Sequence, residues 1–454
     1  MNWKTLLSAK RKGQKPPPTL RDGASAGAAG LSAESSRSAF EQDYDRIIFS
    51  HPFRRLQDKT QVHPLPEHDF VHTRLTHSLE VSSVGRSLGK RAGEIILQRH
   101  PALSAEFSLF DFGAIVAAAA LAHDLGNPPF GHAGEDAISD FFLHHPAGQS
   151  FQGRVSEAAW HDLTQFEGNA QGFRILDKEQ FGLRLTYATL GAFTKYPCAA
   201  YFPEREKKRK SQKKFGFFQS EKAAFSEIAT DLSLIPDKND SWCRHPLAFL
   251  VEAADDICYS IIDLEDGCRL GLVSFDDTVE LLSGILKDKL DRGKLKSHGD
   301  LNQKLGILRA LAIGELIEAS TEIFLSHEEG LLAGTFDQAI TELCEFRDAL
   351  NEIGSVSIEK IYHAKHVVEI EASGHQILPG LLEEFTQTGV HLMERMASRK
   401  YHNLGLLLPV DIVSSVRMKS DDPYHMLRNI IDFVSGLTDR HALVLYRKIK
   451  GISL

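Results

Sequence analysis

The chain has 454 residues, of which 42% are hydrophobic and 25% charged, and its formal net charge is −9. This composition is typical of a soluble globular protein, and the length fits two or three domains or one large helical body with extensions. The negative charge excludes a general nucleic-acid coat, although local basic clusters can still attract anions.

No segment has the pattern of a membrane span or a secretory signal. The most apolar stretch, "FGAIVAAAALAHDLG" at 112–126, is shorter than the ~20 residues that a span needs. The N-terminal sequence "MNWKTLLSAKRKG" lacks a long apolar region and a cleavage site. The five cysteines are odd in number and form no CxxC, which argues against a disulfide framework or a zinc knuckle. We therefore expect a cytoplasmic protein without a membrane partner.

The chain begins with a segment of biased composition. Residues 13–38 are rich in Gly, Ala, Ser and Pro and include "PPP" and "GASAGAAG", which predicts an extended or flexible arm. We expect this arm to occupy residues 1–39, a core 40–280 and a further helical region 281–454.

Helical spacing begins at Phe40 and dominates the rest of the chain. The pattern at 43–56 is interrupted by Pro52, and the segment 74–98 carries an apolar stripe typical of a long amphipathic helix. The segment 110–125 is apolar on nearly all sides and is therefore predicted to be a buried helix, ended by Gly126 and Pro128-Pro129. Further helical patterns lie at 166–179, 245–267, 278–290 and 301–325. The most plausible strand is "HVVEI" at 366–370, so the predicted fold class is mainly α with at most a small β element.

A basic run, "REKKRKSQKK", lies at 205–214 within a predicted insertion at 203–214. It is interpreted as a solvated, mobile insertion. The alternative is binding of single-stranded DNA, because Phe215, Phe217 and Phe218 follow the basic run and aromatic rings can stack on bases.

Four side chains on three predicted helices have the chemistry of a metal site. His77 lies on the helix 74–98, with Glu80 three positions later; His123 and Asp124 end the buried helix, and Asp255 lies on another apolar helix. A lone buried histidine is more often a hydrogen-bonded core residue than a ligand. Unpaired carboxylates in apolar helices are costly, however, and a dication would compensate both acids. The four together favour one divalent metal with positions left for water and substrate.

Several motifs resemble one enzyme family. The motifs are "RLTHSLEV" (74–81), "HDLGNPPFGHAGE" (123–135), "FEGNAQGFRIL" (166–176) and "EAADDICY" (252–259). They resemble the HD-domain hydrolases and, more narrowly, the deoxynucleoside triphosphate (dNTP) triphosphohydrolases, the bacterial dGTPase family. The resemblance runs from about Phe40 to Leu382 and implies an HD-domain helical core with additional C-terminal helices.

The resemblance implies a site and a reaction. Its metal ligands fall on His77, His123, Asp124 and Asp255, with Mg²⁺ or Mn²⁺ favoured and Fe²⁺, Co²⁺, Ni²⁺ or Zn²⁺ compatible. Water attacks the α-phosphorus of a dNTP, and triphosphate leaves from the deoxynucleoside. The implied acid–base residue is His132, oriented by Glu135. The implied substrate-binding residues are Gln61, Val62, Arg54, Arg74, Lys195, Tyr196, Tyr259 and Asp263, with Glu80, Glu167 and Asn169 as supporting groups; Lys59 is a further cation in the matched segments.

The resemblance also implies partners. We expect dGTP as the preferred substrate or as one of several, an allosteric dNTP, and a homo-oligomer, a hexamer by resemblance. One alternative is an HD phosphohydrolase of nucleoside monophosphates or cyclic nucleotides. Another is a catalytically silent sensor of nucleotides or single-stranded nucleic acid.

Overall fold

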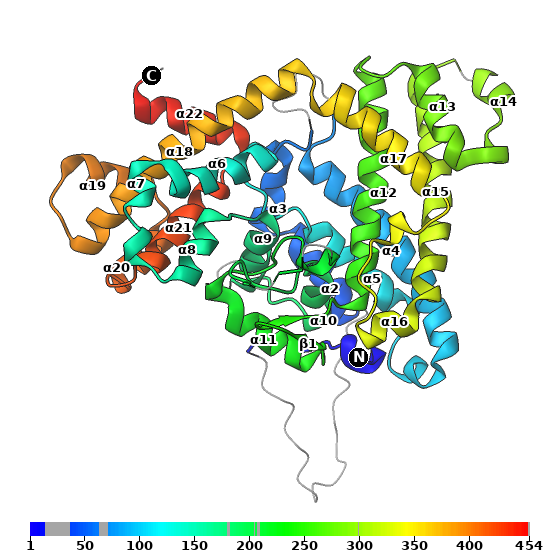
Figure 1. Cartoon of the computed structure of the whole chain (residues 1–454), viewed down its shortest axis with the longest axis horizontal. Coiled ribbons are helices and arrows are strands. Elements are labelled where there is room, and N and C mark those ends of the chain that lie inside the picture. Colours follow the sequence, from blue (N-terminus) through cyan, green and yellow to red (C-terminus); the bar gives the residue numbers. More distant parts are fainter. Residues whose placement is uncertain are drawn as a thin grey trace, which may run out of the picture.

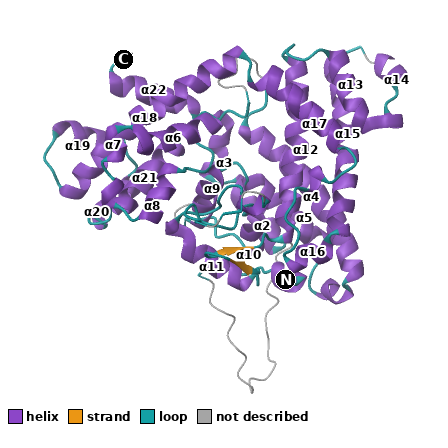
Figure 2. Ribbon diagram, in the orientation of Figure 1, coloured by secondary structure: helices purple, strands orange, loops and turns teal. Residues whose placement is uncertain are grey.

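The computed structural model of the chain describes residues 1–13, 37–62, 71–178, 182–203, 205–206, 209–297 and 299–452. Helices dominate this part of the chain (Figures 1 and 2). The α-helices are α1 (Trp3–Leu6), α2 (Ala39–Ile48), α3 (His51–Arg55), α4 (Arg74–Arg99), α5 (Leu109–Ala122), α6 (Gly131–His144), α7 (Pro146–Gln149), α8 (Glu157–Thr164), α9 (Gly168–Asp177), α10 (Tyr187–Phe193), α11 (Lys222–Asp231), α12 (Pro246–Arg269), α13 (Phe275–Leu286), α14 (Arg292–Ser297), α15 (Leu301–Ser326), α16 (Glu328–Ala333), α17 (Arg347–Val356), α18 (Lys365–Glu394), α19 (Arg399–Gly405), α20 (Val410–Met418), α21 (Pro423–Ser435) and α22 (Asp439–Lys450). Two short strands, β1 (Pro236–Asp237) and β2 (Ser241–Trp242), pair antiparallel.

The prediction of a mainly α fold with a small β element is confirmed, but the predicted strand is wrong. Residues 366–370 belong to α18, a helix of 30 residues. Val367 is buried and Val368 is 46% exposed, as expected for neighbours on a helix that packs one face against the protein. Three β-branched residues among these five do not outweigh the packing of the whole helix.

The helix α4, which carries His77, packs closely on α5, which is followed directly by His123 and Asp124. The helix α4 starts at Thr73, whose hydroxyl accepts a hydrogen bond from the Thr76 N–H. The two backbones approach closely at Gly89, where an added Cβ would lie 2.7 Å from the Phe112 carbonyl oxygen. The helix α5 ends at Ala122, and the turn that follows it carries His123 and Asp124.

Two hydrophobic cores lie on either side of the turn after α5. The larger includes side chains of α4, α5, α12 and α15, and the smaller joins α6 to α18 and α21. Figure 1 shows α18 running along the top of the molecule beside α6 and α22. Residues after 280 therefore pack against α6, inside the segment 40–280 that we predicted as the core.

The prediction of a flexible arm over residues 1–39 is wrong for its first residues. Trp3 and Leu6 of α1 are buried, and the Trp3 indole Nε1–H donates to Glu328 at 2.8 Å. Most of the predicted arm, residues 14–36, lies outside the described residues. The first residues are ordered because two apolar side chains and a buried hydrogen bond fix them to α16.

The interpretation of residues 205–214 as a mobile, solvated insertion is contradicted for part of this run, because Ser211 and Gln212 are buried while Glu206 and Lys213 are exposed. Arg209 Nε donates to Asp337 at 3.0 Å, and Lys210 Nζ lies 2.5 Å from Glu342. The following residues, Phe215, Phe217 and Phe218, are buried. Those three rings are core side chains, so they offer no surface on which a nucleic-acid base could stack.

Within the described segments, no helix combines the length and the apolar character that crossing a bilayer requires.

Candidate active site

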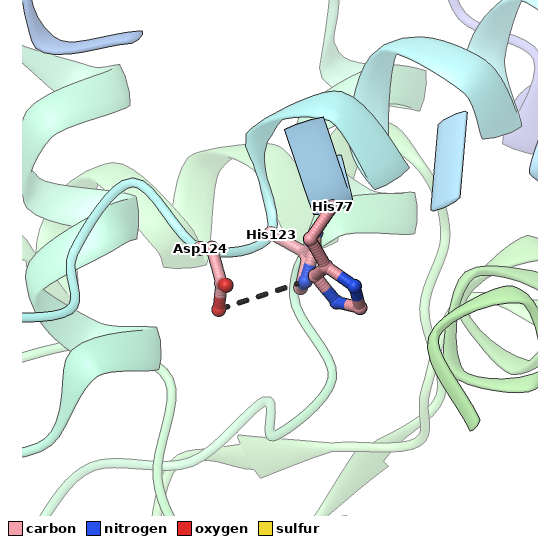
Figure 3. Close-up of side chains that lie close together, drawn as sticks. All are labelled: His77, His123 and Asp124. Carbon is pink, nitrogen blue, oxygen red and sulfur yellow. Dashed lines mark ion pairs between the residues drawn. The ribbon is translucent and has the colours of Figure 1, made fainter. Parts of the chain in front are cut away.

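The predicted metal ligands come together from three helices. The ligand atoms of His77, His123 and Asp124 all lie within 4.8 Å of one another (Figure 3). Asp255, on α12, has Oδ1 3.3 Å from His77 Nε2 and 3.5 Å from His123 Nε2. The four residues form one cluster where α4, the end of α5 and α12 meet.

The protonation of His123 suits a cation. Its Nδ1 lies 2.7 Å from the Ala120 carbonyl oxygen, which can only accept, so Nδ1 carries the proton. The remaining nitrogen, Nε2, then presents a lone pair 3.5 Å from both Asp124 Oδ1 and Asp255 Oδ1. A lone pair and two carboxylate oxygens repel one another, and a divalent cation between them would remove the repulsion. The residues present therefore fit a divalent metal.

Both carboxylates are held in the ionised form. Burial by itself would raise the pKa of Asp124, but the adjacent Arg74 guanidinium outweighs it, and the pKa is lowered to about 2. Burial likewise opposes ionisation of Asp255, but neighbouring groups, among them the His77 hydrogen bond and the Lys195 charge, outweigh it, so this pKa also lies below its usual range. Ionised carboxylates are the form that binds metals.

A cavity of about 380 Å³ opens beside the cluster. It brings together many of the residues predicted from the sequence. Those that line it are Gln61, Val62, Arg74, His123, Asp124, His132, Glu135, Glu167, Asn169, Lys195, Tyr196, Asp255 and Tyr259.

The residues His132 and Glu135 lie three positions apart near the start of α6, as their spacing predicted. This helix starts from Phe130, whose φ of 65° is in the left-handed region. Burial lowers the pKa of His132, and the positive charges of Lys214 and Arg74 lower it further. Burial and the neighbouring Glu167 raise the pKa of Glu135 to about 7.

The predicted orientation of His132 by Glu135 has no hydrogen bond to support it in the part of the chain that the structure describes. Glu135 Oε1 instead accepts the Gly168 N–H at 2.6 Å. A Cβ at position 168 would lie 2.2 Å from the Asn127 side-chain oxygen and 2.8 Å from Glu135 Oε1. Glycine in the motif "FEGNAQ" thus permits a close approach of α9 to the turn after α5, which sequence reasoning missed.

Three cationic side chains line the cavity. Arg74 is buried, and its Nη1 donates to Asp124 Oδ2 at 2.7 Å. Lys195 Nζ lies 3.3 Å from Glu252. Lys214 Nζ lies 3.1 Å from Glu167, and sequence analysis missed it because it ends the basic run that we interpreted as mobile.

Two aromatic residues form part of the wall. Tyr196 is buried, and the Lys195 Nζ lies 5.9 Å from the centre of its ring. Tyr259 is 43% exposed, and its ring centre lies 5.5 Å from that of Tyr362. Tyr362 also lines the cavity and was not predicted.

Four residues predicted for the site do not line the cavity. His77 is buried, and it reaches the cluster through its Nε2, 3.3 Å from Asp255 Oδ1. Arg54 is exposed on α3. Asp263 is buried and accepts a hydrogen bond from the Tyr362 hydroxyl at 2.8 Å, so it contacts a residue of the cavity wall without lining the cavity itself. Glu80 lies 3.3 Å from His72 instead of contacting His77.

Comparisons with known proteins agree with this geometry. Residues 74–166 match the family model described as HD domain, and residues 343–448 match the phosphohydrolase-associated domain. A deoxyguanosinetriphosphate triphosphohydrolase-like protein of Synechocystis sp. is 42% identical over 465 residues, covering 100% of both chains. A protein of the same name from Pseudomonas aeruginosa is 39% identical, over 100% of this chain and 99% of its own.

A relative named without the qualifier is also similar. The deoxyguanosinetriphosphate triphosphohydrolase of Salmonella arizonae is 31% identical and covers 91% of this chain and 94% of its own. The chain belongs to the HD-domain phosphohydrolases, in the family of deoxyguanosinetriphosphate triphosphohydrolases and triphosphohydrolase-like proteins.

Proposed function

We propose that this HD phosphohydrolase hydrolyses dNTPs to a deoxynucleoside and inorganic triphosphate. One observation carries the proposal: three members of the His–Asp cluster (His123, Asp124 and Asp255) and the cations Arg74, Lys195 and Lys214 line a single cavity. A triphosphate carries several negative charges, so its binding requires cations beyond a metal. A cavity that binds a nucleoside monophosphate or a cyclic nucleotide would need fewer cationic side chains.

The residues His77, His123, Asp124 and Asp255 would hold one divalent ion, for which Mg²⁺ or Mn²⁺ is our first choice. When bound, such an ion neutralises phosphate charge and lowers the pKa of water. The side chains that do not bind it must then hold the triphosphate and move protons.

His132 is assigned to the proton transfer. Water adds to the α-phosphorus while the bond from this phosphorus to O5′ breaks, and O5′ needs a proton as it leaves. Lys214 and Arg74 lower the pKa of His132, so its imidazolium form readily gives its proton to O5′. The attacking water returns a proton to the imidazole, and the other proton of the water leaves with the triphosphate or enters solvent. Glu135, nearby on the same helix turn, stabilises the imidazolium by its charge.

The sugar and base of the nucleotide are assigned to the part of the cavity wall formed by Gln61, Val62, Tyr196 and Tyr259. Gln61 and Val62 contact the sugar edge, while Tyr196 and Tyr259 form walls beside the nucleoside. A wall without a partner for a ribose 2′-hydroxyl would leave that hydroxyl buried and unpaired, which favours deoxynucleotides. A preference for dGTP, an allosteric dNTP and a hexamer are expectations that come from the family resemblance alone.

Product analysis tests the proposal. We would incubate the purified chain with each dNTP and each NTP, with Mg²⁺ or Mn²⁺, and separate the products. Deoxynucleoside with intact triphosphate is the expected result. Release of orthophosphate or pyrophosphate contradicts attack at the α-phosphorus, and the absence of any product, even in dNTP mixtures, favours a silent sensor.

The variant His132→Ala tests the proton transfer. It should bind metal and dNTP as the wild type does, while kcat falls by about 10² to 10⁴. Titration calorimetry gives the binding, and single-turnover kinetics gives the rate. Wild-type turnover in this variant would remove His132 from the mechanism.

A further inference from the structure

The carboxylate of Asp439 joins three parts of the chain that are far apart in sequence. Asp439 is the first residue of α22 and is 1% exposed. One of its oxygens, Oδ1, accepts the Phe130 N–H at 3.1 Å. The other, Oδ2, accepts the Thr60 N–H at 3.0 Å and also the Thr60 hydroxyl.

Each of these contacts borders the cavity. Phe130 is the residue directly before α6, the helix that carries His132 and Glu135. Its left-handed backbone is uncommon for a large side chain and needs support from its surroundings. Asp439 supplies one such support, and the close packing of the Phe130 ring on Gly374 of α18 supplies another, because a Cβ at Gly374 would lie 3.1 Å from that ring.

The contact with Thr60 acts on the other side of the cavity. Thr60 precedes Gln61 and Val62 and forms an isolated β-bridge with Thr73, the residue at the start of α4. Arg74, the first residue of α4, donates its backbone N–H to the Lys59 carbonyl oxygen at 3.2 Å. The position of Gln61 and Val62 thus depends on the same carboxylate that holds Phe130.

A neighbouring contact joins the same three regions. The buried Lys59 Nζ donates to the Asn127 carbonyl oxygen at 2.5 Å and to the Ser435 carbonyl oxygen at 2.9 Å. The Asn127 side chain in turn donates to Asp124 Oδ1 at 2.5 Å. The turn between α21 and α22 is therefore bonded both to the segment 59–60 and to the turn 123–130.

We propose that Asp439 is a positioning residue for the reaction: it sets the start of α6, and with it His132, relative to the segment that carries Gln61 and Val62. The inference rests on the proposed function and adds a role for the phosphohydrolase-associated domain, which contributes Asp439. The residue lies behind the cavity wall and does not line it.

The chemistry of the three bonds predicts that even an isosteric change disrupts them. An asparagine has one acceptor oxygen, and its NH₂ group would face either the Phe130 N–H or the Thr60 N–H, donor against donor. One of the two segments would then lose its partner. The test therefore uses Asp439→Asn as well as Asp439→Ala, so that a folding defect in the second does not end the experiment.

The control is Asp422→Ala, at the residue that caps the start of α21. Asp422 Oδ1 accepts the His425 N–H at 2.9 Å within its own helix start, and Asp422 does not line the cavity. Both sites thus lose an aspartate from the start of a helix in the same domain. Only the change at 439 removes a bond to the cavity segments.

For Asp439→Asn we expect kcat to fall at least about tenfold, because small misplacements of reacting groups cost large factors in rate. We also expect KM to rise about threefold or more. Loss of folded protein alone would lower the apparent kcat and leave KM unchanged. Asp422→Ala should change neither constant beyond the effect of any lost protein. Wild-type kcat and KM in Asp439→Asn overturn the proposal.

Hydrogen exchange supplies an independent measurement. In the wild type, the backbone amides of Phe130 and Thr60 should exchange slowly. In Asp439→Asn, at least one of these two amides should exchange about tenfold faster or more. In Asp422→Ala, the exchange rates of both amides should equal those of the wild type. Unchanged protection of both amides in Asp439→Asn overturns the proposal. If the wild type hydrolyses no nucleotide, the proposed function fails, and the exchange rates still decide whether Asp439 fixes these segments.

Discussion

At the scale of single residues, Asp124 is where the contacts of the site converge. Its carboxylate accepts from Arg74 at 2.7 Å and from the Asn127 side chain at 2.5 Å, and it lies 3.5 Å from His123 Nε2. These donors hold the carboxylate ionised and orient it toward the cluster. An aspartate on the surface of α6 has no such contacts.

We expect Asp124→Ala to lose both bound metal and turnover, because it removes one ligand and leaves the buried Arg74 guanidinium without its partner. Metal content per chain, measured by elemental analysis after dialysis against Mn²⁺, checks this. The matched control is Asp136→Ala, an exposed residue on α6, which should keep both. Full metal content in Asp124→Ala would remove Asp124 from the ligand set.

Lys214 gives a second prediction at this scale. The variant Lys214→Gln should raise KM for a dNTP about tenfold or more, because one charge-assisted contact to phosphate is worth about 1.5–3 kcal/mol. Its neighbour supplies the control: Lys213 is exposed and does not line the cavity, so Lys213→Gln should leave KM unchanged. Steady-state kinetics at fixed ionic strength measures both. Equal effects of the two variants would mean that general surface charge, and not a cavity contact, raises KM.

At the scale of secondary-structure elements, the distance between α4 and α5 sets the ligand geometry, since His77 lies on one and His123 follows the other. Gly89→Ala should destabilise the protein by about 1–3 kcal/mol, because the new methyl group meets the Phe112 carbonyl oxygen at 2.7 Å. The metal affinity should fall as the helices separate. Thermal unfolding and metal titration measure the two effects.

The control for this change is Gly314→Ala within α15, where an added Cβ has no neighbour within 4 Å. There the substitution should stabilise the protein by up to about 1 kcal/mol, because alanine favours a helix over glycine. A stabilising Gly89→Ala would show that α4 and α5 can separate without cost to the fold.

The same scale shows how far the sequence predicts the structure. Periodicity predicted α4 and α5, because it depends on neighbours along one helix. The four side chains predicted as metal ligands do meet although they come from three separate helical segments, and it was the resemblance of their motifs to a known family that grouped them. The strand at 366–370 was wrong because a local β-branched run ignores the 30-residue helix around it. Lys214 was missed because its partner Glu167 is 47 residues away, and the Asp439–Phe130 bond spans 309 residues. No local pattern contains such pairs.

At the scale of the whole molecule, buried charges join the associated domain to α9. Arg174 on α9 donates to Asp432 on α21 at 2.8 Å and to Glu221 at 2.5 Å, and Lys178 also pairs with Asp432. Arg174 and Asp432 are both largely shielded from solvent. A substitution at the Arg174–Asp432 pair should therefore lower the free energy of unfolding of the entire chain, and not only the stability of one helix.

Asp432→Asn should destabilise the folded protein by about 3–5 kcal/mol, because it leaves the buried Arg174 charge undercompensated. Burial alone would raise the pKa of Asp432, but Arg174 and Lys178 lower it well below its usual range. The carboxylate therefore contributes its stability above the unfolded-state pKa of about 4 and loses it as the pH falls below that value toward the folded-state pKa. Urea unfolding from pH 7 to pH 3 should show the difference between wild type and variant shrinking below pH 4. A difference independent of pH would mean that the charge of Asp432 does not hold the two parts of the molecule together.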